Sequence, residues 1–551
     1  MANWRDYFDA ASRAASFLRG LGLKPGDRIG IMAPSSAEWD IAQMGALAAG
    51  ATVVGIDVHE HDARLAAMLD ITHITALVVG EEGMLARLPA AARDRLRFVI
   101  SLAPVAGASG VAHWGTLMEN AFAGAEWVNQ ASPDEAALIV FTSGTTGAPK
   151  GIAYTHRQVC LACDAILDAF SDIAPGSRLA CWLPLSNLFQ RMINFCAIAH
   201  GGETYYVSDP RDIMRHLPRI APHVFIAVPR FYEKFHAGIQ ARVQSGPRWR
   251  RRLFGIAMDN ARVLATARRT RLHGSWLRQL AHALLDMLVL RRVRAVLGGH
   301  IRFLVSGSAP MPKWLLEDLD ALGMPVCEAY GMSENIVPIS ANRPGAIKPG
   351  SVGKPLRHNE IRIAEDGELL VRGPGVFSGY LGEPPVLRTA DGYFASGDYA
   401  ELDADGFITL TGRKSEIFKT STGRRIAPAG IESCITRLPF VEQAVVIGTN
   451  RPFLIAIVWI ASDRFAAEGG LQQAASRIRG EVRAAVAELP DYQQPAGLIL
   501  SSRMPAIGRG EMTPNLKLRR RQIETNYAAE IEQLYGMLRN QNENSVVVIT
   551  E

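Results

Sequence analysis

Apolar runs alternate with helical patterns along the first part of the chain. Apolar residues recur at helical spacing over residues 4–21, a break containing Gly and Pro follows at 22–27, and residues 28–32 form a short apolar run typical of a buried strand. The alternation continues with helical patterns at 39–49 and 62–69 and strand patterns at 52–56, 76–79 and 136–140. Because strand and helix alternate on this scale, we predict parallel sheets with crossover helices.

The pattern changes after residue 350. Short alternating strands are separated there by Asp-Gly pairs at 366–367, 391–392 and 405–406, which indicates antiparallel hairpins and a small β subdomain. Toward the end, strand and helix alternate again, with an apolar run at 454–459 and a helical pattern at 478–489. We expect the tail after Tyr535 to be dispensable.

The loop that follows the predicted strand at 136–140 has a composition suited to a polyphosphate. Its small residues are Thr142, Ser143, Gly144, Thr145, Thr146, Gly147 and Gly151. Glycines let the backbone approach a ligand closely, and hydroxyl and amide groups supply donors without adding negative charge. Lys150 is followed by Gly151 instead of Ser or Thr, so the common P-loop pattern is not met and a kinase-type ATPase is disfavoured. The alternative is a polar surface turn.

Length and composition indicate the number of domains, the state of the cysteines and the cellular location. A chain of 551 residues and 59.9 kDa is too long for one compact core, so we expect at least two domains. Six cysteines, at 160, 163, 181, 196, 327 and 434, lie in apolar segments and are expected to be buried free thiols of a reducing compartment. Cys160 and Cys163 lack a second pair that would complete a zinc set. No cleavable leader or long uncharged apolar run is evident, so we predict a cytoplasmic protein.

One segment carries most of the charge asymmetry. Thirteen arginines lie between Arg242 and Arg294 against two aspartates, within a helical pattern at about 246–297. Two interpretations fit this pattern equally well: a helical face exposed to solvent, and contact with an anionic surface. Arginines suit a solvent-exposed face because their aliphatic stems cover apolar surface while their charged heads stay hydrated. We keep peripheral membrane contact through these helices as a prediction and expect no nucleic acid as a partner. The oligomeric state is open, with a dimer as one option.

The loop Thr-Ser-Gly-Thr-Thr-Gly-Ala-Pro-Lys-Gly at 142–151 resembles the phosphate loop of the adenylate-forming superfamily, which includes acyl-CoA synthetases, luciferases and peptide-synthetase adenylation domains. Segments 184–191 and 224–234 and the helical region at 246–297 resemble the long-chain acyl-CoA synthetase subgroup. At 184–191 that subgroup has Pro-Leu-x-His-x-x-Glu-Arg, capping the fatty-acid tunnel, whereas this chain has Asn187 and Gln190 in place of His and Glu.

The resemblance implies a domain organisation. We expect an α/β fold with a large N-terminal adenylation domain, residues 1–412, built of two α/β sheets plus a small β subdomain at about 350–412. A small mobile α+β C-terminal domain, residues 413–551, would follow a hinge near Ser415.

The resemblance also assigns site residues. Phosphates would be held by the loop residues Thr142, Ser143, Gly144, Thr145, Thr146, Gly147 and Lys150, and Ser333 would also contact phosphate while Glu334 would hold Mg²⁺. The adenine would be bordered by Gly307, Ser308 and Ala309, and Tyr330 would stack on it beside Gly331. Asp398 and Arg413 would bind the ribose, Lys517 would be catalytic, and Gly423 would face the site during thioester formation. Taken without the resemblance, residues 330–334 could be a surface turn, Asp398 a hairpin residue and Lys517 part of a basic helix start.

The implied activity is that of an AMP-forming acid:CoA ligase using ATP, Mg²⁺ and coenzyme A. A bulky apolar carboxylic acid, similar to a long-chain fatty acid, would be converted to acyl-AMP with release of pyrophosphate and then transferred to coenzyme A. The alternatives are transfer to a carrier protein, β-lactone formation, or a non-catalytic protein that binds a nucleotide or a membrane. Which acid is used cannot be read from the sequence, because a tunnel is lined by several separate segments.

Overall fold

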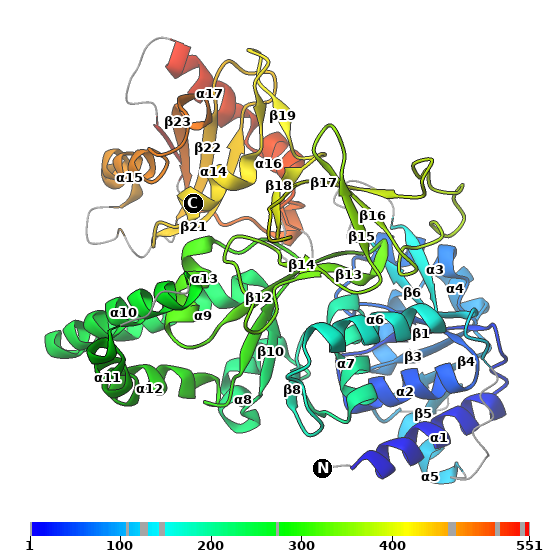
Figure 1. Cartoon of the computed structure of the whole chain (residues 1–551). Helices are drawn as coiled ribbons and strands as arrows, with labels where there is room; N and C mark the ends of the chain where they lie inside the picture. Colours follow the sequence, from blue (N-terminus) through cyan, green and yellow to red (C-terminus); the bar gives the residue numbers. More distant parts are fainter. Residues whose placement is uncertain are drawn as a thin grey trace. The chain divides into compact units, whose positions relative to one another are not determined.

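The computed structural model describes residues 3–105, 110–121, 131–142, 149–270, 275–460, 465, 470–512, 518–539 and 546–549. The chain forms two compact units (Figure 1). The first contains Met1–Arg362, Val371–Phe394 and Asp403–Ile408; the second contains Ile363–Leu370, Ala395–Leu402 and Thr409–Glu551. The domain boundary expected at 412/413 stays a prediction.

The first sheet of the first unit is mostly parallel, as the alternating pattern predicted. Its strand order is β5 (Val111–His113), β4 (Phe98–Ser101), β3 (Ala76–Val79), β1 (Arg28–Met32), β2 (Thr52–Gly55), β6 (Ala136–Phe141) and β7 (Gly151–Thr155). Neighbours are parallel except for β6 and β7, which are antiparallel and bracket the phosphate-loop sequence. β3 is buried along its whole length because helices cover both faces of such a sheet.

The second sheet of this unit carries the other predicted nucleotide loops. Its order is β14 (Lys354–Pro355), β13 (Asn335–Ala341), β12 (Val326–Met332), β11 (Phe303–Ser306), β10 (Val224–Ala227), β8 (Arg178–Cys181) and β9 (Glu203–Tyr206). β9, β8, β10, β11 and β12 are parallel, whereas β13 and β14 are antiparallel to their neighbours. Parallel strands align their carboxyl ends, so the loops after β11 and β12 lie at the same edge.

The helices of the first unit are α1 (Trp4–Gly20), α2 (Ala37–Ala48), α3 (Asp62–Thr72), α4 (Ala90–Asp94), α5 (Trp114–Asn120), α6 (His156–Ala169), α7 (Leu188–His200), α8 (Ile213–Ile220), α9 (Pro229–Gln244), α10 (Arg248–Arg269), α11 (Trp276–Leu285), α12 (Arg291–Arg294) and α13 (Lys313–Ala321). Three of them, α1 to α3, begin and end close to the predicted breaks, whereas the helical region predicted at about 246–297 is divided into several helices. A capping box between Asn3 and Asp6 starts α1. α1 then packs so closely on α2 that a Cβ at Gly45 would lie 2.5 Å from the Cβ of Ala14.

A four-stranded sheet follows, in the order β15 (Glu360–Ile363), β16 (Glu368–Arg372), β17 (Phe394–Leu402) and β18 (Ile408–Arg413). Two of the predicted Asp-Gly turns, at 366–367 and 405–406, connect neighbouring strands of this sheet. The third, at 391–392, closes a local turn in which the Gly392 amide donates to the Thr389 carbonyl at 2.8 Å.

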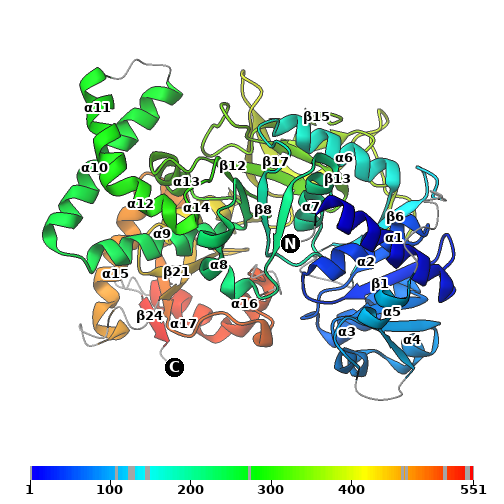
Figure 2. The ribbon, with the colours of Figure 1, turned by 90° about the horizontal axis from the view of Figure 1, so that it is seen from below.

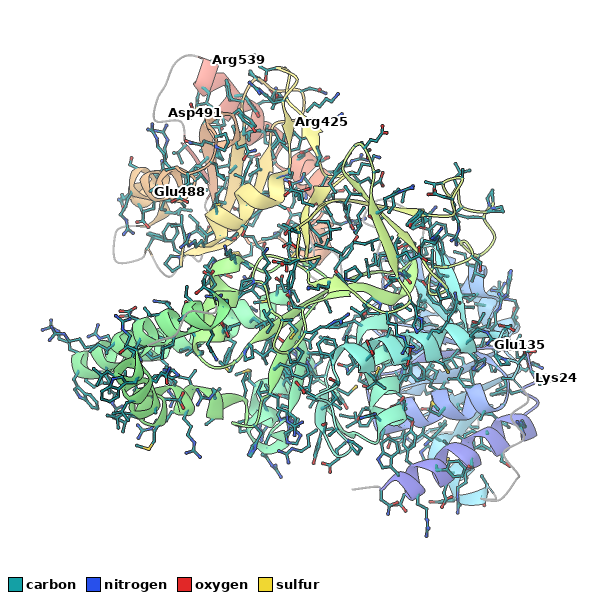
Figure 3. All side chains as sticks on the ribbon, in the orientation of Figure 1. Lys24, Glu135, Arg425, Glu488, Asp491 and Arg539 are labelled. Carbon is teal, nitrogen blue, oxygen red and sulfur yellow. The ribbon has the colours of Figure 1, made fainter. Side chains whose placement is uncertain are left out.

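The second unit contains a sheet buried on both faces. This sheet has the order β21 (Val441–Ile447), β22 (Ile455–Ile460), β23 (Gly497–Ser501) and β24 (Val546–Ile549). The unit also contains a hairpin of β19 (Phe418–Lys419) and β20 (Arg425–Ile426), and Figure 3 labels Arg425. Its helices are α14 (Pro428–Thr436), α15 (Leu471–Ala485), α16 (Arg520–Asn526) and α17 (Ala528–Arg539). Val458 packs in one hydrophobic cluster and Trp459 in the other, so successive β22 residues serve opposite faces.

The structure corrects two expectations. The tail after Tyr535, which we expected to be dispensable, completes α17 and supplies β24, which pairs in parallel with β23. The cysteines are free, but Cys160 is exposed and Cys434 is only half-buried. Among the helices that the structure describes, none is both long and apolar enough to cross a membrane.

Candidate functional site

The two ends of the phosphate-loop sequence are held by antiparallel strands. Phe141 on β6 pairs with Gly151 on β7, and the Thr142 amide donates to the Lys150 carbonyl at 3.1 Å. The Thr142 carbonyl accepts a further bond from Arg64 Nη2 at 2.7 Å. The predicted contacts Ser143, Gly144, Thr145, Thr146 and Gly147 lie outside the described residues. The base of the loop is therefore anchored to the sheet edge.

Lys150 lies in a small charged cluster with residues far away in the sequence. Its Nζ is 2.9 Å from Glu383 Oε2 and 4.6 Å from the centre of the Tyr380 ring. The Tyr380 hydroxyl donates to Glu334 Oε1 at 2.8 Å. Burial and then this bond to a carboxylate raise the pKa of Tyr380, so its hydroxyl stays protonated. The candidate phosphate-binding cation and the candidate metal carboxylate thus share one contact residue, Tyr380.

The backbone holds Tyr380 firmly in this place. The Leu381 amide donates to the Gly151 carbonyl at 2.8 Å, and Tyr380 forms an isolated bridge with Ile152 of β7. The Phe377 amide donates to the Glu334 carbonyl at 2.9 Å, and the Phe377 ring meets the Tyr380 ring edge-on at 4.9 Å. The segment 376–383 therefore fastens the phosphate loop to the end of β12. Sequence reasoning missed Tyr380 and Glu383, which carry no local motif.

The loop after β11 is shaped by a close contact and an unusual backbone. A Cβ placed on Gly307 would lie 3.3 Å from Cζ of Phe189 on α7, tighter than ordinary packing, so glycine suits this position. Ser308 has φ of +74°, a left-handed conformation that non-glycine residues seldom adopt. Ser308 and Ala309 are both exposed. The structure thus presents the three predicted adenine-loop residues at a sheet edge, with backbone strain at the central one.

The end of β12 brings the next predicted residues beside that loop. Ser306 of β11 pairs with Glu328 of β12, and the register against β13 shifts between Tyr330 and Met332, so a bulge falls at Gly331. Tyr330 is buried and Gly331 exposed. Ser333 and Glu334 lie in the turn that follows, and the Tyr154 hydroxyl donates to the Ser333 carbonyl. The structure therefore brings the loops of β11 and β12 together at one edge of the sheet.

A buried carboxyl group lies directly beneath these loops. Burial raises the pKa of Glu328 to about 7, while the Met311 amide, which donates to its Oε1 at 3.1 Å, opposes that rise. Glu328 was not expected from the sequence to be in the interior. Its side chain ties the segment after the adenine loop to β12.

The predicted ribose-binding pair is formed within the second unit. Arg413 Nε donates to Asp398 Oδ1 at 3.0 Å, joining β18 to β17. Asp398 is buried, and its amide donates to the Ser396 hydroxyl at 3.1 Å. Arg413 remains half-exposed. A buried carboxylate oriented by a guanidinium is an acceptor suited to adjacent hydroxyl groups.

The remaining predicted residues of this unit are Gly423 and Lys517. Gly423 turns the β19–β20 hairpin with φ of +80°, and a Cβ there would meet no atom within 4 Å. Its backbone conformation favours glycine, while the space beside it is open. Lys517 lies outside the described residues.

The segment proposed to cap an acyl tunnel rests on a buried polar network. Asn187 caps α7, accepting from the Phe189 amide at 3.0 Å, and Gln190 Nε2 donates to Asn194 Oδ1 at 3.1 Å. Arg191 is fully buried, and burial lowers its pKa to about 9, although the nearby Asp40 opposes the shift. Asn187 and Gln190 therefore have structural roles here, which their positions in the motif did not indicate.

The carboxylates of this site could bind Mg²⁺ only together with phosphate oxygens of a bound substrate. Within the described residues no group of three or more His, Cys, Asp or Glu side chains could hold a metal ion. Mg²⁺ is commonly bound through one or two carboxylates together with substrate phosphates and water. Glu334, half-buried with Oε1 held by Tyr380, is compatible with that arrangement.

Comparison with known proteins bears on the whole chain. Residues 2–381 match the AMP-binding enzyme family, and residues 416–539 match the AMP-binding enzyme C-terminal domain. The chain is 32% identical to a long-chain-fatty-acid–CoA ligase of Mycobacterium bovis, over 95% of this chain and 90% of that protein. It is 30% identical to the human long-chain-fatty-acid–CoA ligase 1, over 74% of this chain and 62% of that protein.

A solved structure supports the fold independently of sequence identity. The A domain of the carboxylic acid reductase from Segniliparus rugosus, solved with AMP and a co-purified carboxylic acid, matches with a TM-score of 0.75 at 19% identity, covering 97% of this chain and 87% of that one. The predicted fold class is confirmed by this likeness. Because the family models match residues 2–381 and 416–539, the chain belongs to the AMP-binding enzyme family.

Proposed function

We propose that this protein is an ATP-dependent acid:CoA ligase that activates a long-chain, apolar carboxylic acid. The observation that carries the proposal is the identity of 32% over nearly the whole chain with a long-chain-fatty-acid–CoA ligase. The cluster of Lys150, Tyr380 and Glu334 supports it, because it joins a cation and a carboxylate suited to a magnesium-bound polyphosphate.

The reaction has two steps. The substrate carboxylate attacks the α-phosphate of ATP, forming the acyl–phosphate bond as the bond to pyrophosphate breaks. The thiol of coenzyme A then attacks the acyl carbonyl, and AMP leaves with the electron pair of the broken C–O bond. The protein needs no covalent intermediate, so its task is to place two anions together and to offset their charge.

The charged groups of the first unit have distinct roles in this proposal. Lys150, with Thr145 and Thr146, holds the β- and γ-phosphates, and Ser333 contacts phosphate. Glu334 would hold Mg²⁺, which offsets phosphate charge when bound. Lys150 is paired with Glu383, so it must exchange that carboxylate for phosphate when ATP binds; both side chains are partly exposed, which keeps the cost of exchange low.

The residues from 398 onward supply the ribose pair and the step-specific residues. Asp398 and Arg413 bind the ribose hydroxyls, Lys517 contacts the carboxylate and the α-phosphate during adenylation, and Gly423 serves the thioester step. We infer a division into residues 1–412 and 413–551, which agrees with family matches that end at residue 381 and resume at residue 416. A cytoplasmic location with peripheral membrane contact through helices 246–297 completes the proposal.

The experiment that tests the function measures pyrophosphate release from ATP with a series of acids. We expect a twelve-carbon acid to be preferred over acetate by several orders of magnitude, because each buried methylene contributes about 0.8 kcal/mol. Coenzyme A, a carrier protein and a no-acceptor control then separate thioester formation from the carrier-protein and β-lactone alternatives. Acetate used as well as the twelve-carbon acid would contradict the assigned substrate class.

A matched pair of variants tests the magnesium carboxylate. Glu334→Gln keeps the shape of the side chain and removes its charge, so pyrophosphate exchange is expected to fall by roughly 100-fold or more. Glu383→Gln should retain most of the activity, since Glu383 only pairs with Lys150 in the absence of ATP. Near-normal exchange by Glu334→Gln would remove Glu334 from this role.

A further inference from the structure

Helix α11 and the π-helical turn after it, Asp286–Leu290, expose a row of large apolar side chains. The inner face contributes Leu285, Val289 and Leu290 to the core, whereas the outer face leaves these side chains exposed: Trp276, Leu277, Leu280, Leu284, Met287 and Leu288. Trp276 is 71% exposed and Leu280 65%. Exposed apolar residues scattered singly are normal, but a contiguous row of this kind marks an interaction surface.

Helix α10 extends this row. Its inner face buries Phe254, Ala257, Met258, Ala261 and Ala265. Trp249, Ile256 and Val263 are exposed at seven-residue spacing and so lie on one face. Asn260, one turn from both Ile256 and Val263, donates through Nδ2 to the Arg278 carbonyl at 3.2 Å. The exposed stripe of α10 therefore borders α11, and Figure 2 shows the two helices side by side beyond the strands β8 and β12.

The net charge around this apolar surface is positive. Exposed arginines flank it at both ends: Arg248, Arg250, Arg251, Arg252, Arg291 and Arg292. The two aspartates of the region are already paired, Asp259 with Arg262 at 3.3 Å and Asp286 with Arg294 at 2.6 Å. In the described part of the chain, none of the six flanking arginines pairs with an acidic side chain. The surface is thus apolar at its centre and cationic at its margin.

We propose that the outer faces of α10 and α11 dock on an anionic lipid bilayer, with the apolar row inserted at the level of the headgroups. Large apolar side chains on one face with arginines beside them are the pattern of helices that lie in a membrane interface. A second copy of this chain fits less well, because pairing two such faces would bring their arginines together. Nucleic acid would use the arginines but leave the exposed tryptophans and leucines unburied. The proposal extends the expected membrane contact by naming the helix face and the lipid charge.

Flotation of the full chain with vesicles tests this proposal. We expect vesicles of phosphatidylcholine with about 30% phosphatidylserine to bind at least roughly tenfold more protein than phosphatidylcholine alone, with binding that weakens as salt increases. Pyrophosphate exchange measured without vesicles reports the proposed ligase activity separately, so failure of docking and failure of the function are distinguishable.

Two pairs of variants separate the apolar and the charged contributions. Leu280→Ser with Leu284→Ser should lower binding to both vesicle types by about tenfold, because apolar burial at the interface is lost. Leu387→Ser, at a site 91% exposed outside the surface, is the matched control and should bind normally. Arg291→Gln with Arg292→Gln should remove only the preference for anionic vesicles, whereas the exposed Arg93→Gln should retain it.

Three results would overturn the proposal. Vesicle binding unchanged in the double-leucine variant would show that this face is not the contact. A dimer in sedimentation that this variant dissociates, without vesicle binding by the wild type, would make a second copy the occupant. Binding to duplex DNA that exceeds binding to anionic vesicles and is insensitive to the leucine changes would make nucleic acid the partner.

Discussion

The hydroxyl of Tyr380 links the candidate metal carboxylate to the phosphate loop. It donates to Glu334 Oε1, while its ring lies under Lys150. A hydrogen bond to a charged group contributes about 1.5–3 kcal/mol, and here it also orients the carboxylate. Tyr380 therefore positions Glu334.

Replacing Tyr380 by Phe removes the hydroxyl and keeps the ring. We expect the Mg²⁺ concentration for half-maximal pyrophosphate exchange to rise on the order of tenfold, because Glu334 loses the donor that orients it. Tyr393→Phe is the control, since the Tyr393 ring lies against Arg362 and Arg372 outside the site. If Tyr380→Phe lowered activity without changing the Mg²⁺ dependence, the positioning role would be wrong.

Glu328 provides a pH test at the same edge. Its pKa of about 7 in the folded protein lies above the ordinary value of 4.5, so folding favours the protonated form. The stability from this group is complete below pH 4.5 and is lost as the pH rises through 7. Glu328→Gln should therefore lose less stability than the wild type between pH 5 and 8, by roughly 3 kcal/mol at most.

Urea unfolding of the wild type and of Glu328→Gln at pH 5 and at pH 8 measures this difference in stability. Glu334→Gln, at a half-buried carboxylate, is a control for loss of one negative charge near the site. Parallel pH profiles for the wild type and Glu328→Gln would mean that Glu328 is ionised in the folded protein.

Residue identity alone singled out the candidate nucleotide loops but not the residues that support them. The residues at 142–151, 307–309 and 330–334 form contiguous motifs, so their chemistry can be read locally. Tyr380 follows Lys150 and Glu334 only after long separations and joins no motif. A single tyrosine in a loop can serve many purposes, and only tertiary contacts such as the pairing of Tyr380 with Ile152 bring it into the cluster.

At the scale of elements, the final strand β24 adds both hydrogen-bonded pairing and buried side chains to the second unit. Residues 546–549 pair along β23, and Val547 packs in the cluster that contains Trp459 and Tyr535. Tyr535 itself is buried, and its hydroxyl donates to the Phe453 carbonyl at 3.0 Å. The apolar run is visible in the sequence, but its pairing partner is far away along the chain and cannot be recognised by local pattern.

Val547→Asp tests this contribution. It places a charge among apolar side chains, so we expect the second unit to lose about 3 kcal/mol of stability or more. Fluorescence of the buried Trp459 during urea unfolding measures it, ideally with the other tryptophans replaced by phenylalanine. Gln472→Asp on an exposed position of α15 adds the same charge and should change stability by less than about 0.5 kcal/mol. Equal stability of the two variants would mean that β24 adds nothing to this unit.

At the scale of the whole molecule, the proposed division of labour predicts a split between half-reactions. Lys517→Ala should fail to form acyl-AMP from acid and ATP, with a loss of several kcal/mol of transition-state stabilisation. The same protein should still convert supplied acyl-AMP and coenzyme A to thioester at a near-normal rate. Arg521→Ala, four residues later, should retain both steps. Equal loss in both assays would assign Lys517 to folding or coenzyme A binding instead.

The sequence by itself determined the family and the α/β fold class, and it singled out the short segments that we propose to bind the nucleotide. The fold class follows from the alternating apolar patterns, which act over a few residues, whereas the family follows from the resemblance of the loop at 142–151 and of later segments to known motifs. Only the tertiary structure decided that Tyr380 connects Lys150 with Glu334, that Glu328 is buried beneath the loops, and that the last strand completes a sheet. It also decided that the leucines of α11 face outward, because periodicity reveals an apolar stripe but not whether another element covers it.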